Sequence, residues 1–270
     1  MNYGCVFVTA QQESEPYILS VDTTTDLRSV AVCLGPRRLA QTAGSLRATQ
    51  SANLLSDIDA TLKAAGLRLA EIDLFACAIG PGSFTGLRAG LATMKAFAAT
   101  LRKPIVGVPT LHAVARAAGI APRIVAALPA GRGELFAQLL ASNADGSVTE
   151  LGVPAHLPPQ ALVVRALDWP LPLRWAGAGA HARSELIGAA ARLAAIEWWG
   201  EFDQSDAEEG SALLAGARVW SLAPQAGAYA AEVAALALAE YRAGRTLQAA
   251  ELRALYVRLS DAELNERCHV

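Results

Sequence analysis

The stretch AIGPGSFTGLR, at residues 78–88, constrains the fold of this chain more than any other feature. An apolar run at residues 72–79, typical of a buried strand, leads into it, and Leu87, Leu91 and Met94 follow at helical spacing. Its three glycines predict a tight corner, because glycine relieves steric crowding where a strand turns directly into a helix. Such a unit indicates an α/β protein with helices packed on a sheet.

This corner does not match three familiar chemical motifs. A P-loop requires Gly-Lys-Ser/Thr, but Leu87 follows Gly86. A dinucleotide fingerprint would need glycine at Thr85, and a nucleophile elbow around Ser83 would need glycine at Pro81 and Thr85. The start of the following helix still offers free N–H groups to an anion, so weak anion binding stays open beside the packing role.

Other segments extend the α/β pattern along the chain. Strands are predicted at 17–21 and 29–34, joined into a hairpin by a polar turn, and at 104–108, with helices at 49–65 and 85–101. The second half predicts strands at 123–128, 134–141, 162–165 and 173–176, and helices at 181–196 and about 228–244.

Composition excludes some classes of function. The 270 residues carry a formal net charge of −2, which gives no argument for binding bare nucleic acid or an anionic membrane. No apolar run reaches the roughly 18 to 20 residues of a membrane span. Four scattered cysteines without a CxxC pair predict a reduced, cytoplasmic protein. The four histidines form no metal-binding pattern, so no metal site and no catalytic residue are predicted.

Asp22, Thr23, Thr24 and Thr25 follow the first strand and offer a second candidate for chemistry. An acid and hydroxyls in a hairpin turn can face a phosphate or a magnesium-bound water. The same residues also form Asx-type turns that satisfy their own backbone. The residues alone leave both interpretations open.

Several segments together resemble the TsaB family, the dimerisation subunit of the bacterial machinery that makes threonylcarbamoyladenosine on tRNA. The segments are Tyr17–Thr25, Ser29–Leu34, Ile79–Ala98, Pro104–Leu111 and Leu255–Arg258. The block IGPGSFTGLRAGLATMKAFA is highly specific to that family. The resemblance implies an α/β, two-lobed actin/hexokinase/Hsp70-like (ASKHA, RNase H-like) fold with a degenerate second lobe.

The resemblance also implies a division of the chain. The first lobe would span 16–118 and be joined by the returning helix at about 228–244, and the second would span 119–227. A flexible extension at 1–15, an acidic surface insertion at about 197–210 and a tail at 245–270 would complete the chain.

In this fold Asp22, Thr23 and Thr24 correspond to the first phosphate loop, and Gly177 and Gly179 correspond to the glycine turn on the adenosine side. Weak ATP or ADP binding is therefore possible, although no cofactor is expected.

The resemblance further implies that the chain is not an enzyme. The catalytic relative, TsaD, holds a metal with an HxxxH pair, whereas the two matching positions here are Thr110 and Val114, with His112 between them. Pro129 stands where an acid of the second lobe would sit. The metal and the transfer chemistry are both expected to be absent.

The family pairs with a TsaD-like catalytic subunit through the helices at 49–65 and 85–101, which form a four-helix bundle with the partner. A TsaE-like ATPase and tRNA would join through that pair, and a homodimer can form when the protein is alone. The apolar candidates for this interface are Leu54, Ile58, Leu62, Leu87, Leu91 and Met94. Each of them could instead pack on the chain's own sheet, an alternative that the sequence leaves open.

A rival function is a small ATP-dependent phosphotransferase or ATPase of the same fold. It would need acids on both sides of a nucleotide cleft. Asp22 is present on the first side, but Pro129 argues against the second. The sequence therefore favours the non-catalytic subunit.

Overall fold

The computed structural model describes residues 15–45, 50–201 and 217–257. Most of the expected N-terminal extension, residues 202–210 of the expected insertion and the last part of the expected tail lie outside the described residues. The lobe limits 16–118 and 119–227 stay a prediction.

A mixed sheet of five strands forms the first half of the chain. Its strands are β1 (Tyr17–Asp22), β2 (Leu27–Leu34), β3 (Arg37–Ser45), β4 (Leu74–Ala78) and β5 (Ile105–Val108), in the order β3-β2-β1-β4-β5. The predicted hairpin is confirmed, because β1 and β2 pair antiparallel from Tyr17↔Leu34 to Asp22↔Ser29. Strands β4 and β5 run parallel to β1.

The second sheet repeats this plan. It contains β6 (Ala121–Gly131), β7 (Glu134–Ser142), β8 (Val148–Glu150), β9 (Ala155–Leu157), β10 (Leu173–Ala176), β11 (Glu197–Glu201) and β12 (Val219–Leu222). The order is β11-β12-β10-β6-β7-β8, and β9 also pairs with β7. Strands β6, β7 and β8 are antiparallel, and β10 and β12 are parallel to β6, so the arrangement matches that of the first sheet with β11 added at one edge.

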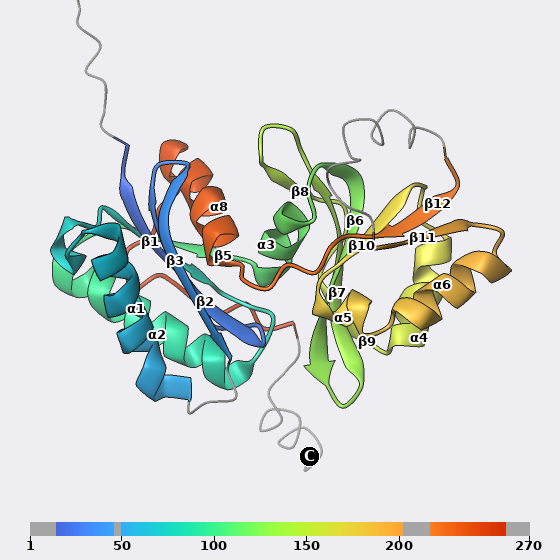
Figure 1. Cartoon of the computed structure of the whole chain (residues 1–270), viewed down its shortest axis with the longest axis horizontal. Helices are drawn as coiled ribbons and strands as arrows, with labels where there is room; N and C mark the ends of the chain where they lie inside the picture. The colour runs from blue at the N-terminus through green and yellow to red at the C-terminus, as the bar shows by residue number, and fades with distance from the viewer. Residues whose placement is uncertain (1–14, 46–49, 202–216, 258–270) are drawn as a thin grey trace, which may run out of the picture.

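Helices cover both sheets and fill the space between them (Figure 1). Helices α1 (Gln50–Ala65) and α2 (Phe84–Leu101) cover the outer side of the first sheet, and α4 (Pro159–Leu167) and α6 (Ser184–Leu193) cover the outer side of the second. Between the sheets lie α3 (Thr110–Ala117) and α8 (Ala230–Arg242). The short α5 (Ala178–His181) and the 3-10 turn η1 (Leu69–Glu71) complete the helices of the described ranges.

Three apolar cores hold the helices and the two sheets together. The middle core is built on Leu111, Val233 and Leu238 between the sheets, and the outer cores on Phe75 and on Trp175. We call the first sheet with α1 and α2 the first lobe, and the second sheet with α4 and α6 the second lobe. Helix α8 follows the second sheet in the chain but packs on β1, β2, β4 and β5, so it ties the two lobes together.

The structure corrects several expectations. The strand predicted at 162–165 is part of helix α4, where Pro159 stands at the first helical turn and Leu162, Val163 and Ala166 are buried at helical spacing. Strand β3 and helix α3 were not predicted. Gly35, with φ of +53°, starts a two-residue turn that reverses the chain directly into β3.

The start of the expected insertion and the start of the expected tail are both packed on the folded body. Glu197–Glu201, the start of the expected insertion, forms strand β11, and Trp198 lies directly over Gly188 of α6. The chain after α8 returns to the first lobe, where Leu247 pairs with Ile105 and Leu252 is buried. None of the described helices is long and apolar enough to cross a membrane.

Candidate functional site

The glycine corner is a packing junction between α2 and the β1–β2 turn. Ser83 caps α2 by accepting a hydrogen bond from the Gly86 N–H at 3.3 Å, and its own N–H donates to the carbonyl of Thr24 at 2.7 Å. A Cβ atom on Gly86 would lie 1.8 Å from the Thr23 carbonyl oxygen, and one on Gly90 would lie 2.2 Å from Thr23 Oγ1. The predicted strand-to-helix corner is confirmed, and the first turns of α2 press against the turn after β1.

Asp22 satisfies its carboxylate within its own turn. The Thr24 N–H and Thr24 Oγ1 donate to Oδ1 at 2.8 and 2.7 Å, and Thr25 Oγ1 donates to Oδ2 at 2.5 Å. The side chain is fully buried, and this burial raises its pKa, although the threonine hydrogen bonds oppose the shift. The hydrogen bond from the Thr24 N–H to Asp22 makes this an Asx-type turn, one of the two interpretations that the sequence left open.

The second glycine turn is also closed by packing. Gly177 has φ of +89°, and a Cβ atom on it would lie 2.5 Å from the Ala127 carbonyl oxygen of β6. A Cβ atom on Gly179 would lie 2.9 Å from the Leu128 nitrogen. Thr23 and Thr24 therefore lie against α2, Asp22 is bonded within its own turn, and Gly177 and Gly179 lie against β6. All five nucleotide candidates are packed against the chain itself, and Thr24 also lines the cavity between the lobes.

The cleft between the lobes holds a cavity of about 980 Å³. Its lining comes from the β1–β2 turn, the start of α2, the β6–β7 hairpin and the segment after α8, and is mainly apolar. Pro129 lies in this lining at the place where an acid was expected. Asp26 and Arg88 are the charged members among the described residues that line it.

The two positions that the resemblance relates to metal ligands, Thr110 and Val114, lie on α3. Thr110 is buried and shares a 2.9 Å hydrogen bond with Thr24 Oγ1, whereas Val114 packs in the middle core. His112 lies 2.9 Å from Glu150, and burial lowers its pKa while Glu150 opposes that shift. In the described ranges no three His, Cys, Asp or Glu side chains gather into a group that could hold a metal ion.

The six side chains expected at a partner interface pack inside this chain. All are at most 8% exposed and belong to the core between α1, α2 and the first sheet: Leu54, Ile58, Leu62, Leu87, Leu91 and Met94. Each of them therefore packs on the chain's own sheet, the alternative that the sequence left open. A partner that docks on these helices would meet the neighbouring outward positions instead.

The outward positions of α1 and α2 form one surface, where the α2 side chains are small and the α1 side chains include an exposed ion pair. We call this surface the α1–α2 face; its exposed members are Leu55, Asp59, Ala60, Lys63, Ala64, Ala92, Ala96, Ala99 and Thr100. Leu55 is 56% exposed, and Asp59 and Lys63 pair with each other at 2.6 Å. Lys95 donates its Nζ to the Leu252 carbonyl at 3.1 Å, away from the exposed alanines. Sequence reasoning chose the larger apolar side chains as the contacts, whereas Ala92, Ala96 and Ala99 are exposed positions of α2.

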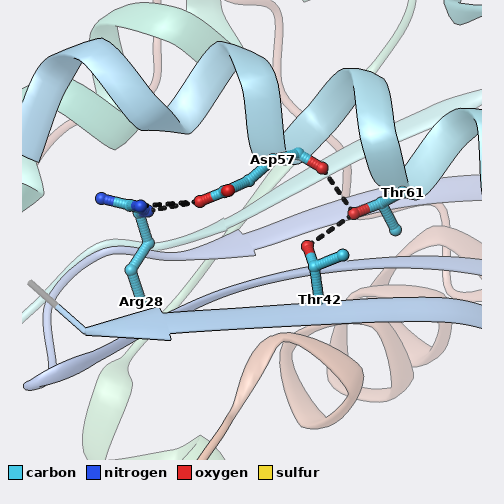
Figure 2. A network of polar contacts seen from close by, with 4 residues as sticks. All are labelled: Arg28, Thr42, Asp57 and Thr61. Atoms are coloured by element: carbon cyan, nitrogen blue, oxygen red, sulfur yellow. Dashed lines mark hydrogen bonds and ion pairs between the residues drawn. The ribbon is translucent and has the colours of Figure 1, made fainter.

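Polar contacts fix α1 on the sheet beneath this face (Figure 2). Arg28 of β2 is 3% exposed, and its Nε and Nη2 lie 2.8 and 2.7 Å from Asp57 Oδ2 on α1. One turn later Thr61 Oγ1 donates to the Asp57 carbonyl and lies 2.7 Å from Thr42 Oγ1 of β3. Buried polar pairs have fixed partners, so these contacts set which side of α1 faces outward.

Comparison with known proteins gives matches to tRNA-modification proteins. A family model described as "TsaD: tRNA N6-adenosine threonylcarbamoyltransferase" matches residues 47–152. The tRNA threonylcarbamoyladenosine biosynthesis protein TsaB of Haemophilus influenzae is 36% identical over 124 residues, which are 44% of this chain and 51% of that protein. TsaB of Escherichia coli is 32% identical over 132 residues, 44% of this chain and 52% of that protein. The chain thus matches about half the length of these curated relatives.

A solved structure extends the likeness to nearly the whole chain. YeaZ from Pseudomonas aeruginosa superposes with a TM-score of 0.69 at 23% identity, and the match covers 89% of this chain and 99% of that one. This likeness shows the fold. Together with the two sheets of matching strand order, it confirms the predicted two-lobed α/β fold class.

Proposed function

Because the chain belongs to the TsaB family, we propose that it acts in the synthesis of threonylcarbamoyladenosine on tRNA as a non-catalytic dimerisation subunit. It binds a TsaD-like catalytic subunit through the α1–α2 face, in a four-helix bundle. Through that pair it joins a TsaE-like ATPase and the tRNA.

The α1–α2 face is the observation that carries this proposal. Along α2 the exposed side chains from Ala92 to Thr100 are small and uncharged. Small side chains allow two helices to approach closely, and burying exposed alanines costs little desolvation. Leu55 on α1 supplies a larger apolar contact at the edge of the same face. A helix exposed to water usually carries charges on such a side, so the uncharged α2 part of this face suits a helical partner.

The state of the nucleotide candidates supports a non-catalytic role. A phosphotransferase of this fold needs carboxylates that reach a metal-bound nucleotide, but Asp22 is fully buried and bonded to Thr24 and Thr25. Thr110 and Val114 supply no imidazole at the metal positions of the catalytic relative. The phosphotransferase alternative is therefore the less supported one.

Calorimetric titration of the full chain tests this proposal. We expect strong heat on addition of the TsaD-like subunit from the same organism, and no resolved heat with ATP and magnesium. Heat with ATP and magnesium but none with the TsaD-like subunit would contradict the proposal and favour the phosphotransferase.

A further inference from the structure

Two exposed aromatic rings meet at the mouth of the interlobe cleft. Phe84 is 41% exposed and Tyr256 is 53% exposed, and their ring centroids are 5.9 Å apart. The guanidinium carbon of Arg88 lies 3.8 Å from the centroid of Phe84. All three side chains line the cavity of about 980 Å³. Burying an exposed aromatic ring against another flat ring is favourable, so this cluster suits a ligand that contains an aromatic ring.

The cluster leaves faces that a ligand can use. Phe84 has Arg88 over its ring and Tyr256 beside it, and all three side chains line the cavity. Among the described residues no carboxylate pairs with Arg88, so its charge is available to an anion. An arginine next to exposed aromatic rings matches the way proteins stack bases and hold the adjoining phosphate.

We propose that Phe84, Arg88 and Tyr256 form a stacking site for an unpaired RNA nucleotide. The base stacks on Tyr256 and the Arg88 plane, and the adjoining phosphate pairs with Arg88. This inference rests on the proposed function for its choice of RNA, and it deepens that function by giving this subunit a contact of its own with the tRNA.

The walls of the cleft are consistent with one nucleotide of a chain. Opposite the cluster, the β6–β7 turn carries Arg132, next to the lining residue Gly131, and Arg183 donates to the carbonyl of Gly133 in the same turn. Asp26, the carboxylate of the described lining, can accept hydrogen bonds from ribose hydroxyls but repels phosphate. The phosphate is therefore expected on the Arg88 side.

An RNA nucleotide fits better than free ATP. A triphosphate is usually bound by several backbone N–H groups of a glycine-rich turn. The two glycine turns of this chain have no room for it, because Gly86 and Gly177 are packed against backbone atoms of neighbouring segments. One arginine suits the single charge of a phosphodiester. Since the net charge of the chain is −2, affinity for RNA is expected to be low when the subunit is alone and to rise in the complex.

Fluorescence anisotropy of a labelled anticodon stem-loop, at low salt, tests the site with the full chain alone and bound to its TsaD-like partner. We expect Tyr256→Leu and Arg88→Gln each to weaken binding about tenfold, since one stacked base contributes ~1–3 kcal/mol. Matched controls are Tyr241→Leu, on an exposed tyrosine of α8, and Arg165→Gln, on an arginine near the ring of Trp169. Neither control should change the affinity.

The other arms separate the alternatives. Equal binding by the variants and the wild type would overturn the site, as would equal binding of an RNA duplex of the same length. Competition by AMP as effective as by the stem-loop would assign the cluster to a free nucleotide instead. Calorimetry with the TsaD-like subunit tests the proposed function separately from the RNA site. If the variants bind RNA like the wild type but the chain still binds the TsaD-like subunit, the RNA site is wrong and the proposed function stands.

Discussion

At the scale of single residues, Asp22 shows how a candidate phosphate-loop acid serves the fold. It occupies the expected place at the end of β1, yet three hydrogen bonds from Thr24 and Thr25 use both of its oxygens. Thr24 also contacts Thr110 on α3, so the turn links the first strand to the layer between the sheets. The residue type was visible in the sequence, but its burial was not.

The raised pKa of Asp22 predicts a dependence of stability on pH. Burial lifts the folded pKa above the unfolded value of 3.8, so between these two values the native state binds more protons and the free energy of unfolding falls as pH rises. The Asp22→Asn variant has no carboxyl group to ionise at this position, so its free energy of unfolding does not fall for this reason as pH rises. Urea unfolding from about pH 4 to about pH 8 should show the variant gaining stability relative to the wild type as pH rises, and then a plateau. A difference that stays constant or shrinks with rising pH would refute the assignment.

Gly86 is expected to tolerate no side chain. The Cβ atom of Gly86→Ala would lie 1.8 Å from a backbone oxygen, so α2 or the turn must move, at a cost of about 1–3 kcal/mol in unfolding free energy. Gly152→Ala is the control, because its Cβ atom would have its nearest neighbour at 3.8 Å. Chemical denaturation of both variants measures the difference; equal stability would mean that the corner is looser than described.

At the scale of elements, α1 depends on its polar link to β2. Asp57→Ala leaves the guanidinium of Arg28 buried without its carboxylate, and we expect a loss of about 2–3 kcal/mol in unfolding free energy. Asp59→Ala removes an exposed ion pair from the same helix and should be close to neutral. Denaturation of both variants tests the link. Similar effects of the two changes would show that Arg28 and Asp57 contribute no more than a surface pair.

Elements with strong periodic patterns were predictable from the sequence. The β1–β2 hairpin, α1, α2 and α8 have long apolar runs with turn residues at their ends, and the structure has them at nearly the expected positions. Strand β3 was not predicted, because it starts with Arg37 and Arg38, which are exposed in an edge strand and show no apolar pattern. The segment 162–165 is rich in valine, which favours strands, but packing against the second sheet made it a helix.

The sequence could not predict which side of a helix packs on the sheet and which side faces outward. Leu91 and Ala92 are neighbours in sequence, yet Leu91 is 8% exposed in the core and Ala92 lies on the α1–α2 face. Spacing identifies an apolar stripe, but whether a sheet or a partner covers it depends on the tertiary arrangement. For the same reason the sequence did not indicate that Phe84 and Tyr256, distant in the chain, meet at the cleft.

At the scale of the whole molecule, two copies of one sheet plan face each other across α3 and α8 (Figure 1). The middle core fixes the lobes to one another, and the cleft between them is lined mostly by apolar side chains. The outer helices of both lobes face away from this middle layer (Figure 1).

The central claim is that the α1–α2 face binds the TsaD-like subunit, and one comparison of binding tests it most directly. Ala96→Glu places a charge on that face, and Ala189→Glu places the same charge on the exposed side of α6 in the second lobe. Leu91→Glu is unsuitable for this test, because it would bury a charge in the core and destabilise the chain itself.

Calorimetry with the TsaD-like subunit should show at least about a tenfold loss of affinity for Ala96→Glu, since a charge would be desolvated in the bundle, and no change for Ala189→Glu. Both variants should melt like the wild type. Wild-type affinity of a folded Ala96→Glu protein would contradict the account.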